Sequence, residues 1–356
     1  MPISARGTRG GIVLPMGLGV LAAACFATTF VLNRMMSVAG GSWMWSASLR
    51  YLLMTLPLLA LVAVRGGLPA VLRSLRARPG VWLLWSTVGF GLFYAPLTWA
   101  GEHGAGWLVA ATWQLVIVAG IALGALGGGR VPLRTLGVSA LIVLGVVLTQ
   151  LQHAGGTGTG DALRVALPVL VAAVAYPLGN RRLLGLDGLD GVQRTLAMTL
   201  GSLPLWLALA GVAAVTQGPP SGGQLTQSLI VALLSGVVAT TLFFRATDRV
   251  RDHPAALGAV EATQAAEVPF TLLGEALLTG AAAPALAGWA GLALIVAGLC
   301  AHALGHVPRG GARRRQPEGA HGAGPEGDEP GADPRHSEAV PRPDRRLQCA
   351  GEERHR

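Results

Sequence analysis

Long apolar runs divide the first 305 residues of this chain into ten segments of about 18–24 residues. A segment of this length crosses roughly 30 Å of hydrocarbon as an α-helix. The apolar positions are continuous and do not alternate, so the pattern favours membrane-spanning helices over the strands of a barrel. The predicted spans are 11–32, 43–64, 80–100, 104–126, 135–152, 164–185, 192–215, 226–247, 255–278 and 285–305.

The composition agrees with an all-α integral membrane protein. Of 356 residues, 52% are hydrophobic and only 13% are charged, and the mean hydropathy is +0.53. All 27 basic residues are arginines, and most of those before residue 307 lie in short loops between apolar runs, so a nucleic-acid partner is not predicted despite a pI near 11.0. Cys25, Cys300 and Cys349 form no CxxC motif, and we predict neither a disulfide framework, a metal site nor a cofactor.

The loop arginines predict the orientation in the membrane. Arg6 and Arg9 precede an apolar run that continues to Leu32, which indicates a retained first helix and not a cleaved signal peptide. Only Arg34 and Arg164 lie in the loops on one side. The other side carries Arg6, Arg9, Arg65, Arg73, Arg76, Arg78, Arg130, Arg134, Arg181, Arg182, Arg245, Arg249 and Arg251. We therefore expect a multi-pass protein of the cell membrane with both termini in the cytoplasm.

The last 50 residues differ from the rest of the chain. Residues 307–356 are rich in Gly, Pro, Arg and Glu and contain almost no large apolar residue. Such a segment cannot bury enough surface to offset the entropy lost on ordering, so we predict a disordered cytoplasmic tail.

Short matches in the same order relate the two halves of the body, offset by 144 to 153 positions. The matched pairs are Asn33-Arg34 with Asn180-Arg181, Arg50 with Arg194, Phe93-Tyr94 with Phe243-Phe244, Ala111-Thr112 with Ala262-Thr263, and the segment 140–145 with 293–298. We predict a cytoplasmic segment 1–10, a first repeat at 11–152 and a second repeat at 153–306. Five helices per repeat is an odd number, so the repeats have inverted topology, a common plan of secondary transporters.

One stretch near the end of the body resembles a known superfamily. Pro269-Phe270, Leu273-Gly274-Glu275 and the glycines at 288, 291 and 298 are similar to the helix 9–10 motif of the drug/metabolite transporter superfamily, of the ten-helix EamA-like type. Ala27-Thr28-Thr29-Phe30 and the segment 176–181 most resemble its putative multidrug resistance efflux transporter family. The resemblance covers about residues 11–305 and implies a transporter. The helix 1 carboxylate of its small four-helix relatives is absent here.

Carboxylates within the membrane are the first candidates for function. Glu267 lies near the middle of the ninth span, where it could bind a cationic substrate or carry a coupled proton. Glu261 lies six residues earlier, at roughly 120° around a regular helix, so the two need not share a face. Glu275 belongs to the Leu-Gly-Glu motif with Gly274, and we expect a structural role for it.

Two arginines and several other polar or aromatic side chains complete the candidate site. Arg50 and Arg194 could neutralise a glutamate of the ninth span, for example in a fixed ion pair of Glu267 with either arginine, or they could hold an anionic substrate. Asn33, Asn180, Gln114 and Gln264 could bind substrate or bridge helices. Trp113 and Trp107 could form an aromatic wall for a cation.

The sequence thus predicts a secondary transporter, an exporter of small and cationic molecules, with H+ as the candidate coupling ion. Its partners would be substrate and lipid, and a homo-oligomer stays open. The Arg pair leaves open a metabolite or nucleotide-sugar-like carrier. A membrane-embedded lipid or glycan enzyme would need a dense cluster of acidic and His residues at one membrane face, which the sequence lacks. Intramembrane charge argues against a mere scaffold.

Overall fold

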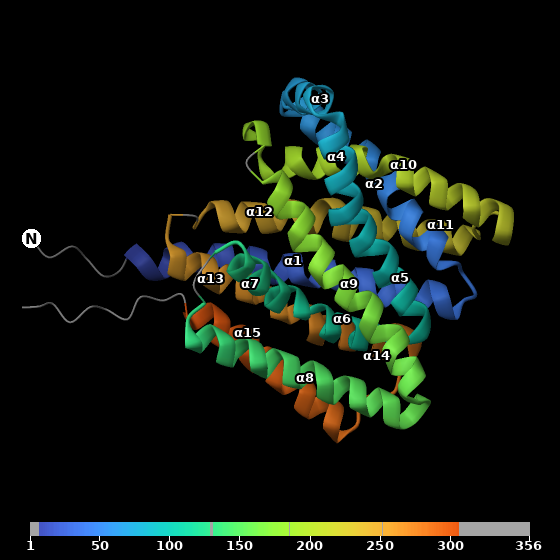
Figure 1. Cartoon of the computed structure of the whole chain (residues 1–356), viewed down its shortest axis with the longest axis vertical. Helices are drawn as coiled ribbons and strands as arrows, with labels where there is room; N and C mark the ends of the chain where they lie inside the picture. The colour runs from blue at the N-terminus through green and yellow to red at the C-terminus, as the bar shows by residue number, and fades with distance from the viewer. Residues whose placement is uncertain (1–6, 129–130, 185, 251, 306–356) are drawn as a thin grey trace, which may run out of the picture. The chain divides into compact units, whose positions relative to one another are not determined.

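The computed structural model describes residues 7–128, 131–184, 186–250 and 252–305, and every regular element in these ranges is a helix (Figure 1). The described residues all belong to one compact unit. The predicted disordered tail at 307–356 lies outside the described residues, as does most of the predicted N-terminal segment 1–10.

The first half of the body runs from α1 to α8. The elements are α1 (Gly7–Val38), α2 (Trp43–Val64), α3 (Leu68–Ala77), α4 (Pro79–Ser86), a π-helical turn (Thr87–Gly91), α5 (Leu92–His103), α6 (Gly106–Trp113), α7 (Leu115–Leu126) and α8 (Leu133–Thr157).

The second half runs from α9 to α15. The elements are α9 (Thr159–Leu183), a short 3-10 helix (Leu186–Gly188), α10 (Gly191–Gln217), α11 (Gly222–Val231), a π-helical turn (Ala232–Ala239), α12 (Thr240–Asp248), α13 (Pro254–Ala262), a 3-10 turn (Thr263–Ala266), α14 (Glu267–Thr279) and α15 (Leu286–Gly305).

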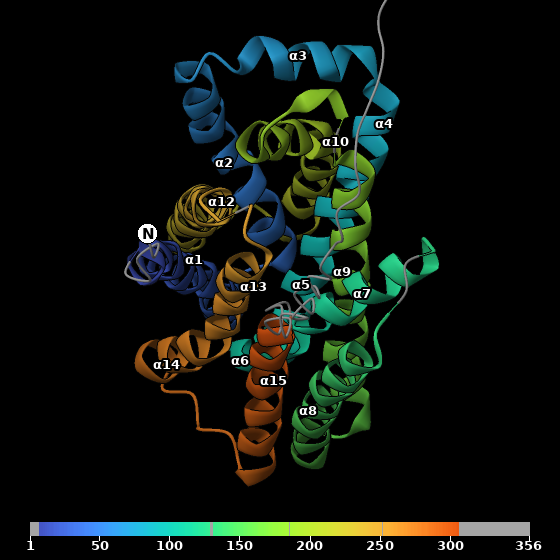
Figure 2. The same ribbon diagram turned by 90° about the vertical axis from the view of Figure 1, so that its left-hand side faces the viewer.

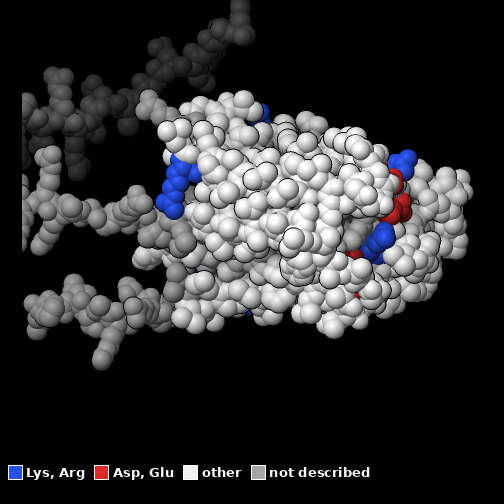
Figure 3. Space-filling model, turned by 90° about the horizontal axis from the view of Figure 1, so that it is seen from below, with Lys and Arg blue, Asp and Glu red and all other residues white. Residues whose placement is uncertain are grey.

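Eight helical stretches in the described ranges are long and apolar enough to cross a membrane, and Leu286–His302 is a shorter apolar helix. These nine match nine of the predicted spans in order. The all-α membrane fold predicted from the sequence is therefore confirmed. On the face formed by α8 and α15, a wide band without charged side chains separates charged groups near the two ends of the helices (Figure 3). A belt of this kind is what lipid contact requires.

The predicted span 255–278 is helical from Pro254 to Thr279, but it is not one regular α-helix. It divides at the 3-10 turn Thr263–Ala266 into α13 and α14. The hydroxyl of Thr263 donates a hydrogen bond to the Val260 carbonyl at 2.6 Å, so a side chain uses an acceptor of the helix backbone. The predicted span 104–126 is interrupted in the same way at Gln114, whose amide donates to the Ala110 carbonyl at 3.2 Å.

Two other spans contain π-helical turns. Thr87–Gly91 interrupts the span of α4 and α5, and Ala232–Ala239 interrupts that of α11 and α12. A π-helical turn rotates the side chains that follow it and is frequent at functional sites. Each half of the chain thus contributes one span with a π-helical turn and one span that is broken.

The short helix α3 was not predicted, because it is too short and too polar to give a membrane signal. Val71 and Ser74 on one side are buried, while Arg76 lies in the last turn. In Figure 2 this helix bridges the end of α2 and the start of α4.

Glycines permit a close contact between α8 and α15. α8 and α15 lie side by side in Figures 1 and 2 and pack along their length. A Cβ atom at Gly145 would lie 2.6 Å from the carbonyl oxygen of Gly291, and one at Gly291 would lie 2.6 Å from that of Gly145. Only hydrogen fits between these backbones, which is the usual reason for glycine at a membrane helix interface.

Candidate functional site

A cavity of about 380 Å³ lies inside the body, among α1, α2, α5, α9, α10 and the four interrupted spans. Eight of the nine residues predicted to bind substrate or ion line it, namely Glu267, Glu261, Arg50, Arg194, Asn180, Gln114, Trp113 and Gln264. The tertiary structure therefore brings together residues from both halves of the chain, more than 200 positions apart.

The two broken spans meet at Glu267. This residue begins α14 directly after the 3-10 turn, and its side chain is 6% exposed. Gln114, at the break between α6 and α7, forms a side-chain hydrogen bond with the Glu267 carboxylate. The Glu267 backbone N–H donates to the Gln264 carbonyl, so the hydrogen-bond pattern changes from 3-10 to α-helical at this residue. Broken helices whose ends face a site are typical of ion and substrate binding in transporters.

Arg50 lies elsewhere on the cavity wall and is 7% exposed. Its Nη1 donates to Thr29 Oγ1 and its Nη2 to Ser235 Oγ, both at 3.0 Å. The Tyr94 ring centroid lies 4.3 Å from the guanidinium carbon, a cation–π contact. Within the described ranges Arg50 makes no salt bridge, so the fixed Arg50–Glu267 ion pair considered from the sequence is absent from this structure.

Aromatic rings form much of the wall between these two charges. Trp113, Phe93 and Tyr176 contact one another, with ring centroids 4.8 Å apart for Phe93 and Trp113 and 4.9 Å for Phe93 and Tyr176. The Tyr176 side chain lies within electrostatic range of both Arg50 and Glu267. Trp107, which the sequence placed beside Trp113 in such a wall, is buried away from the cavity.

The remaining candidates lie toward one end of the cavity. Arg194 is in the first turn of α10, Asn180 is near the end of α9, and Glu261 is exposed on α13. His302, near the end of α15, lines the cavity beside them. Glu261 and Glu267 both line the cavity. The roughly 120° predicted between them assumed a regular α-helix, whereas a 3-10 turn lies between them.

Glu275 lies outside the cavity and holds the start of a broken span. Its two carboxylate oxygens accept hydrogen bonds from the backbone N–H groups of Gly106 and Trp107, each at 2.7 Å. The side chain is 1% exposed. A Cβ atom on the preceding Gly274 would lie 2.9 Å from a methyl group of Val31, so glycine permits the close approach of α14 to α1. Both residues therefore join α14 to neighbouring helices, and the structural role expected for them stays a prediction.

Asn33 is the predicted residue that does not line the cavity. It exchanges hydrogen bonds with the Tyr94 hydroxyl at 3.2 and 3.3 Å. Nearby, Arg34 donates to the Gly101 and Glu102 carbonyls, and Glu102 accepts from the Trp43 backbone at 2.9 Å. Such contacts tie α1, α2 and α5 together at the end of the body opposite Arg194 and His302.

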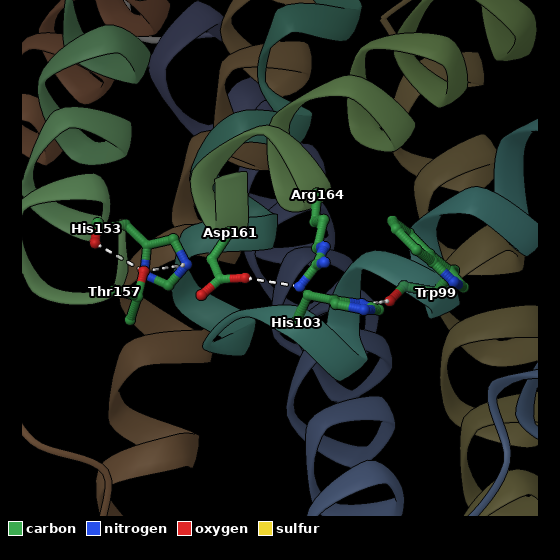
Figure 4. A network of polar contacts seen from close by, with 6 residues as sticks. All are labelled: Trp99, His103, His153, Thr157, Asp161 and Arg164. Carbon is green, nitrogen blue, oxygen red and sulfur yellow. Dashed lines mark hydrogen bonds and ion pairs between the residues drawn. The ribbon is translucent and has the colours of Figure 1, made fainter. Parts of the chain in front are cut away.

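Further polar side chains of α5, α8 and α9 lie at this end, which we call the closed end, and each contact drawn there is within one helix (Figure 4). His103 contacts the Trp99 carbonyl at 3.0 Å, and Thr157 donates to the His153 carbonyl at 2.9 Å. Arg164 forms an exposed ion pair with Asp161 at 2.9 Å. Exposed pairs contribute little stability, but they show that this end is polar where the flanks are apolar.

The sequence did not identify Ser235 and Thr29 as cavity residues, or Tyr94 as a contact of Arg50. Serines and threonines within apolar runs are common, so their pattern alone carries no functional signal. Ser235 reaches Arg50 because it lies in the π-helical turn Ala232–Ala239. A search for hydroxyl groups facing a buried arginine needs coordinates.

Comparison with known proteins identifies the family. A family model described as "Putative multidrug resistance efflux transporter" matches residues 13–307. The chain belongs to this family. It is therefore a multi-pass membrane transporter of the drug/metabolite transporter superfamily, and the resemblance seen in the sequence is confirmed.

Relatives of this transporter carry no assigned function in their names. "Uncharacterized protein YjlA" of Bacillus subtilis is 48% identical over 307 residues, covering 82% of this chain and 95% of that protein. An uncharacterized 42.1 kDa protein of Shouchella clausii is 48% identical over 271 residues, covering 73% and 71%. One crystal structure aligns with a TM-score of 0.56 at 18% identity, covering 85% of this chain and 99% of that one, and supports the fold alone.

Proposed function

We propose that this transporter is a secondary active exporter of small organic cations, and that Glu267 exchanges a proton for the substrate. The observation that carries the proposal is a carboxylate, 6% exposed, in an aromatic-walled cavity where two broken helices meet. An unpaired carboxylate in such a place is costly unless it is protonated or faces a cation. Proton and substrate would therefore compete for one site, which is sufficient for coupling.

Alternating access would use two inverted repeats, residues 11–152 and 153–306. Three features support this organisation. The broken spans, at Gln114 and Thr263–Ala266, occupy matching positions in the two halves, and so do the π-helical turns. The packing partners also correspond, because α1 contacts α12 and α14 while α9 contacts α5 and α7. Two related halves can exchange their conformations around a shared site.

The direction of opening supports an inward-facing state. The cavity reaches Arg194 and His302, at helix ends that the arginine distribution predicts to be cytoplasmic. Hydrogen bonds close the opposite end, among them Trp45 Nε1 to the Gly218 carbonyl at 2.9 Å and Gln224 to the Ser42 carbonyl at 2.7 Å. An exporter loads its substrate from the cytoplasm, where this cavity would be accessible.

An alternative within the same superfamily is a carrier of anionic metabolites, of the nucleotide-sugar-like kind. Arg50 and Arg194 on the cavity wall favour it. The carboxylates at Glu267 and Glu261 oppose it, because they would repel a purely anionic substrate.

Substitution of Glu267 by Gln tests the proposal, because it keeps the shape and removes the charge. In proteoliposomes with an imposed pH gradient, the variant should insert normally and lose gradient-driven flux of an organic cation such as ethidium. Asp161→Asn, on an exposed ion pair, should keep that flux. Normal pH-dependent flux of the organic cation by Glu267→Gln would refute the proposal. If the native protein instead showed gradient-driven flux of an anionic nucleotide sugar and none of the organic cation, the alternative would be established.

A further inference from the structure

We propose that the cavity has a second subsite, formed by Arg50, Thr29 and Ser235, that binds an acidic group of the substrate. The substrate would then be amphoteric: an apolar, aromatic body with an ammonium-type group at Glu267 and a carboxylate-type group at Arg50. This inference rests on the proposed function and narrows its substrate class.

The three side chains form a chain of hydrogen-bond donors. Thr29 Oγ1 accepts from Arg50 Nη1 and donates to Ser235 Oγ at 2.7 Å. Ser235 Oγ accepts from both Arg50 Nη2 and Thr29. A hydroxyl has one proton and two lone pairs, so Ser235, with both lone pairs engaged, has only its proton to offer to a further partner. Ser235, Thr29 and Arg50 all line the cavity, and the group presents donors to it.

The charge of Arg50 has no counter-charge within the described ranges. Its contacts are two hydroxyl groups and the rings of Tyr94 and Tyr51, and its Nε atom is buried without a partner. A buried cation in this position is costly, and the planar guanidinium is well suited to a carboxylate or phosphate oxygen pair. An acidic group of the substrate would supply the missing charge.

Three helices converge to build this subsite, which distinguishes it from an accidental cluster. Thr29 comes from α1, Arg50 from α2, and Ser235 from the π-helical turn that precedes α12. Glu267 binds Gln114 and not Arg50, so the acidic and the basic group both remain for ligands. A simple cation would be attracted by Glu267 and repelled by Arg50, whereas an amphoteric molecule satisfies both.

Binding of three matched probes to the purified full-length protein tests the inference. L-phenylalanine carries both charges, phenethylamine carries only the ammonium group, and hydrocinnamate carries only the carboxylate. Isothermal titration calorimetry should show L-phenylalanine binding at least about tenfold more tightly than either single-charge probe, because a charge-assisted hydrogen bond is typically worth this much.

Variants then assign each charge to its subsite. Arg50→Gln should reduce the affinity for L-phenylalanine to that for phenethylamine and leave phenethylamine binding intact or stronger. Glu267→Gln should reduce it to that for hydrocinnamate. Ser235→Ala keeps the charge of Arg50 and should weaken only the two carboxylate-bearing probes, so it decides the question if Arg50→Gln does not fold. Arg164→Gln, an exposed arginine outside the cavity, should change none of these affinities.

The outcomes separate the two proposals. If phenethylamine binds as tightly as L-phenylalanine, or if Arg50→Gln weakens both equally, the acidic-group subsite is wrong and the cation site stands. If phenethylamine and L-phenylalanine both fail to bind, the proposed cation site fails as well.

Discussion

At the residue scale, this transporter contains two buried carboxylates that differ in their hydrogen-bond partners and in their position relative to the cavity. Glu275 is saturated by two backbone N–H groups, at Gly106 and Trp107, and lies outside the cavity. Glu267 contacts one side-chain amide, at Gln114, and lies on the cavity wall. The first arrangement stabilises one charge state and one geometry, whereas the second leaves a carboxylate oxygen for a proton or a substrate.

The structural role of Glu275 predicts a specific loss of stability. Glutamine at this position keeps one acceptor oxygen and places an amide NH2 opposite the second backbone N–H. Glu275→Gln should therefore lower the free energy of unfolding by about 1–3 kcal/mol. Thermal unfolding in detergent micelles would measure the change.

Glu102→Gln is the matched control for this experiment. Glu102 accepts a single backbone N–H, from Trp43, through one oxygen, which glutamine retains. The thermal unfolding midpoint of Glu102→Gln should stay close to that of the native protein. Equal losses in the two variants would contradict the bidentate role assigned to Glu275.

At the element scale, interruptions and glycine contacts shape the body more than helix propensity does. Two spans break at side chains that occupy helix carbonyls, and the breaks bring Gln114 and Glu267 together. α8 and α15 approach closely enough that their glycine carbonyls fill the space of a Cβ atom. A membrane gives helices little hydrophobic reason to associate, so close packing of this kind carries much of their cohesion.

One substitution in α8 tests the glycine contact, with its own control in the same helix. Gly145→Ala places a methyl group against the Gly291 carbonyl and should cost about 1–3 kcal/mol through overpacking. Gly137→Ala meets no atom within 4 Å and should be neutral or stabilising by up to about 1 kcal/mol. Equal unfolding midpoints for the two variants would show that α8 and α15 do not pack as described.

At the scale of the whole molecule, the cavity reaches one end of the body while hydrogen bonds close the other. Asn33 and Tyr94 join α1 to α5, Arg34 contacts the carbonyls at the end of α5, and Gln224 joins α11 to the start of α2. Alternating access requires these contacts to break while new ones form at the opposite end.

A disulfide across the closed end should arrest transport. A Cβ atom at Gly101 would lie 3.8 Å from the Cβ atom of Asn33, which suits a disulfide. With the three native cysteines replaced, Asn33→Cys with Gly101→Cys should lose flux in proteoliposomes after oxidation and regain it after reduction. Each single variant is the control and should be insensitive to oxidation. Undiminished flux through the cross-linked protein would show that this end does not open during transport.

The fold class, nearly all the membrane spans and the family could be predicted from the amino-acid sequence alone. These follow from the length of apolar runs and from short motifs such as Leu273-Gly274-Glu275, which are local properties of the chain. It also marked nearly every charged candidate, because an ionisable residue within an apolar run stands out wherever it folds.

Which of the candidate residues lie together in the cavity depends on the tertiary structure. A regular helix separates Glu261 from Glu267, and the 3-10 turn lets both face one cavity. Arg50 is hydrogen-bonded to Thr29 and Ser235 and not to Glu267. Ser235 lies 185 positions from Arg50, in a π-helical turn. Breaks and turns of this kind arise where side chains compete with backbone groups, and their consequences depend on how distant helices pack, which no local pattern contains.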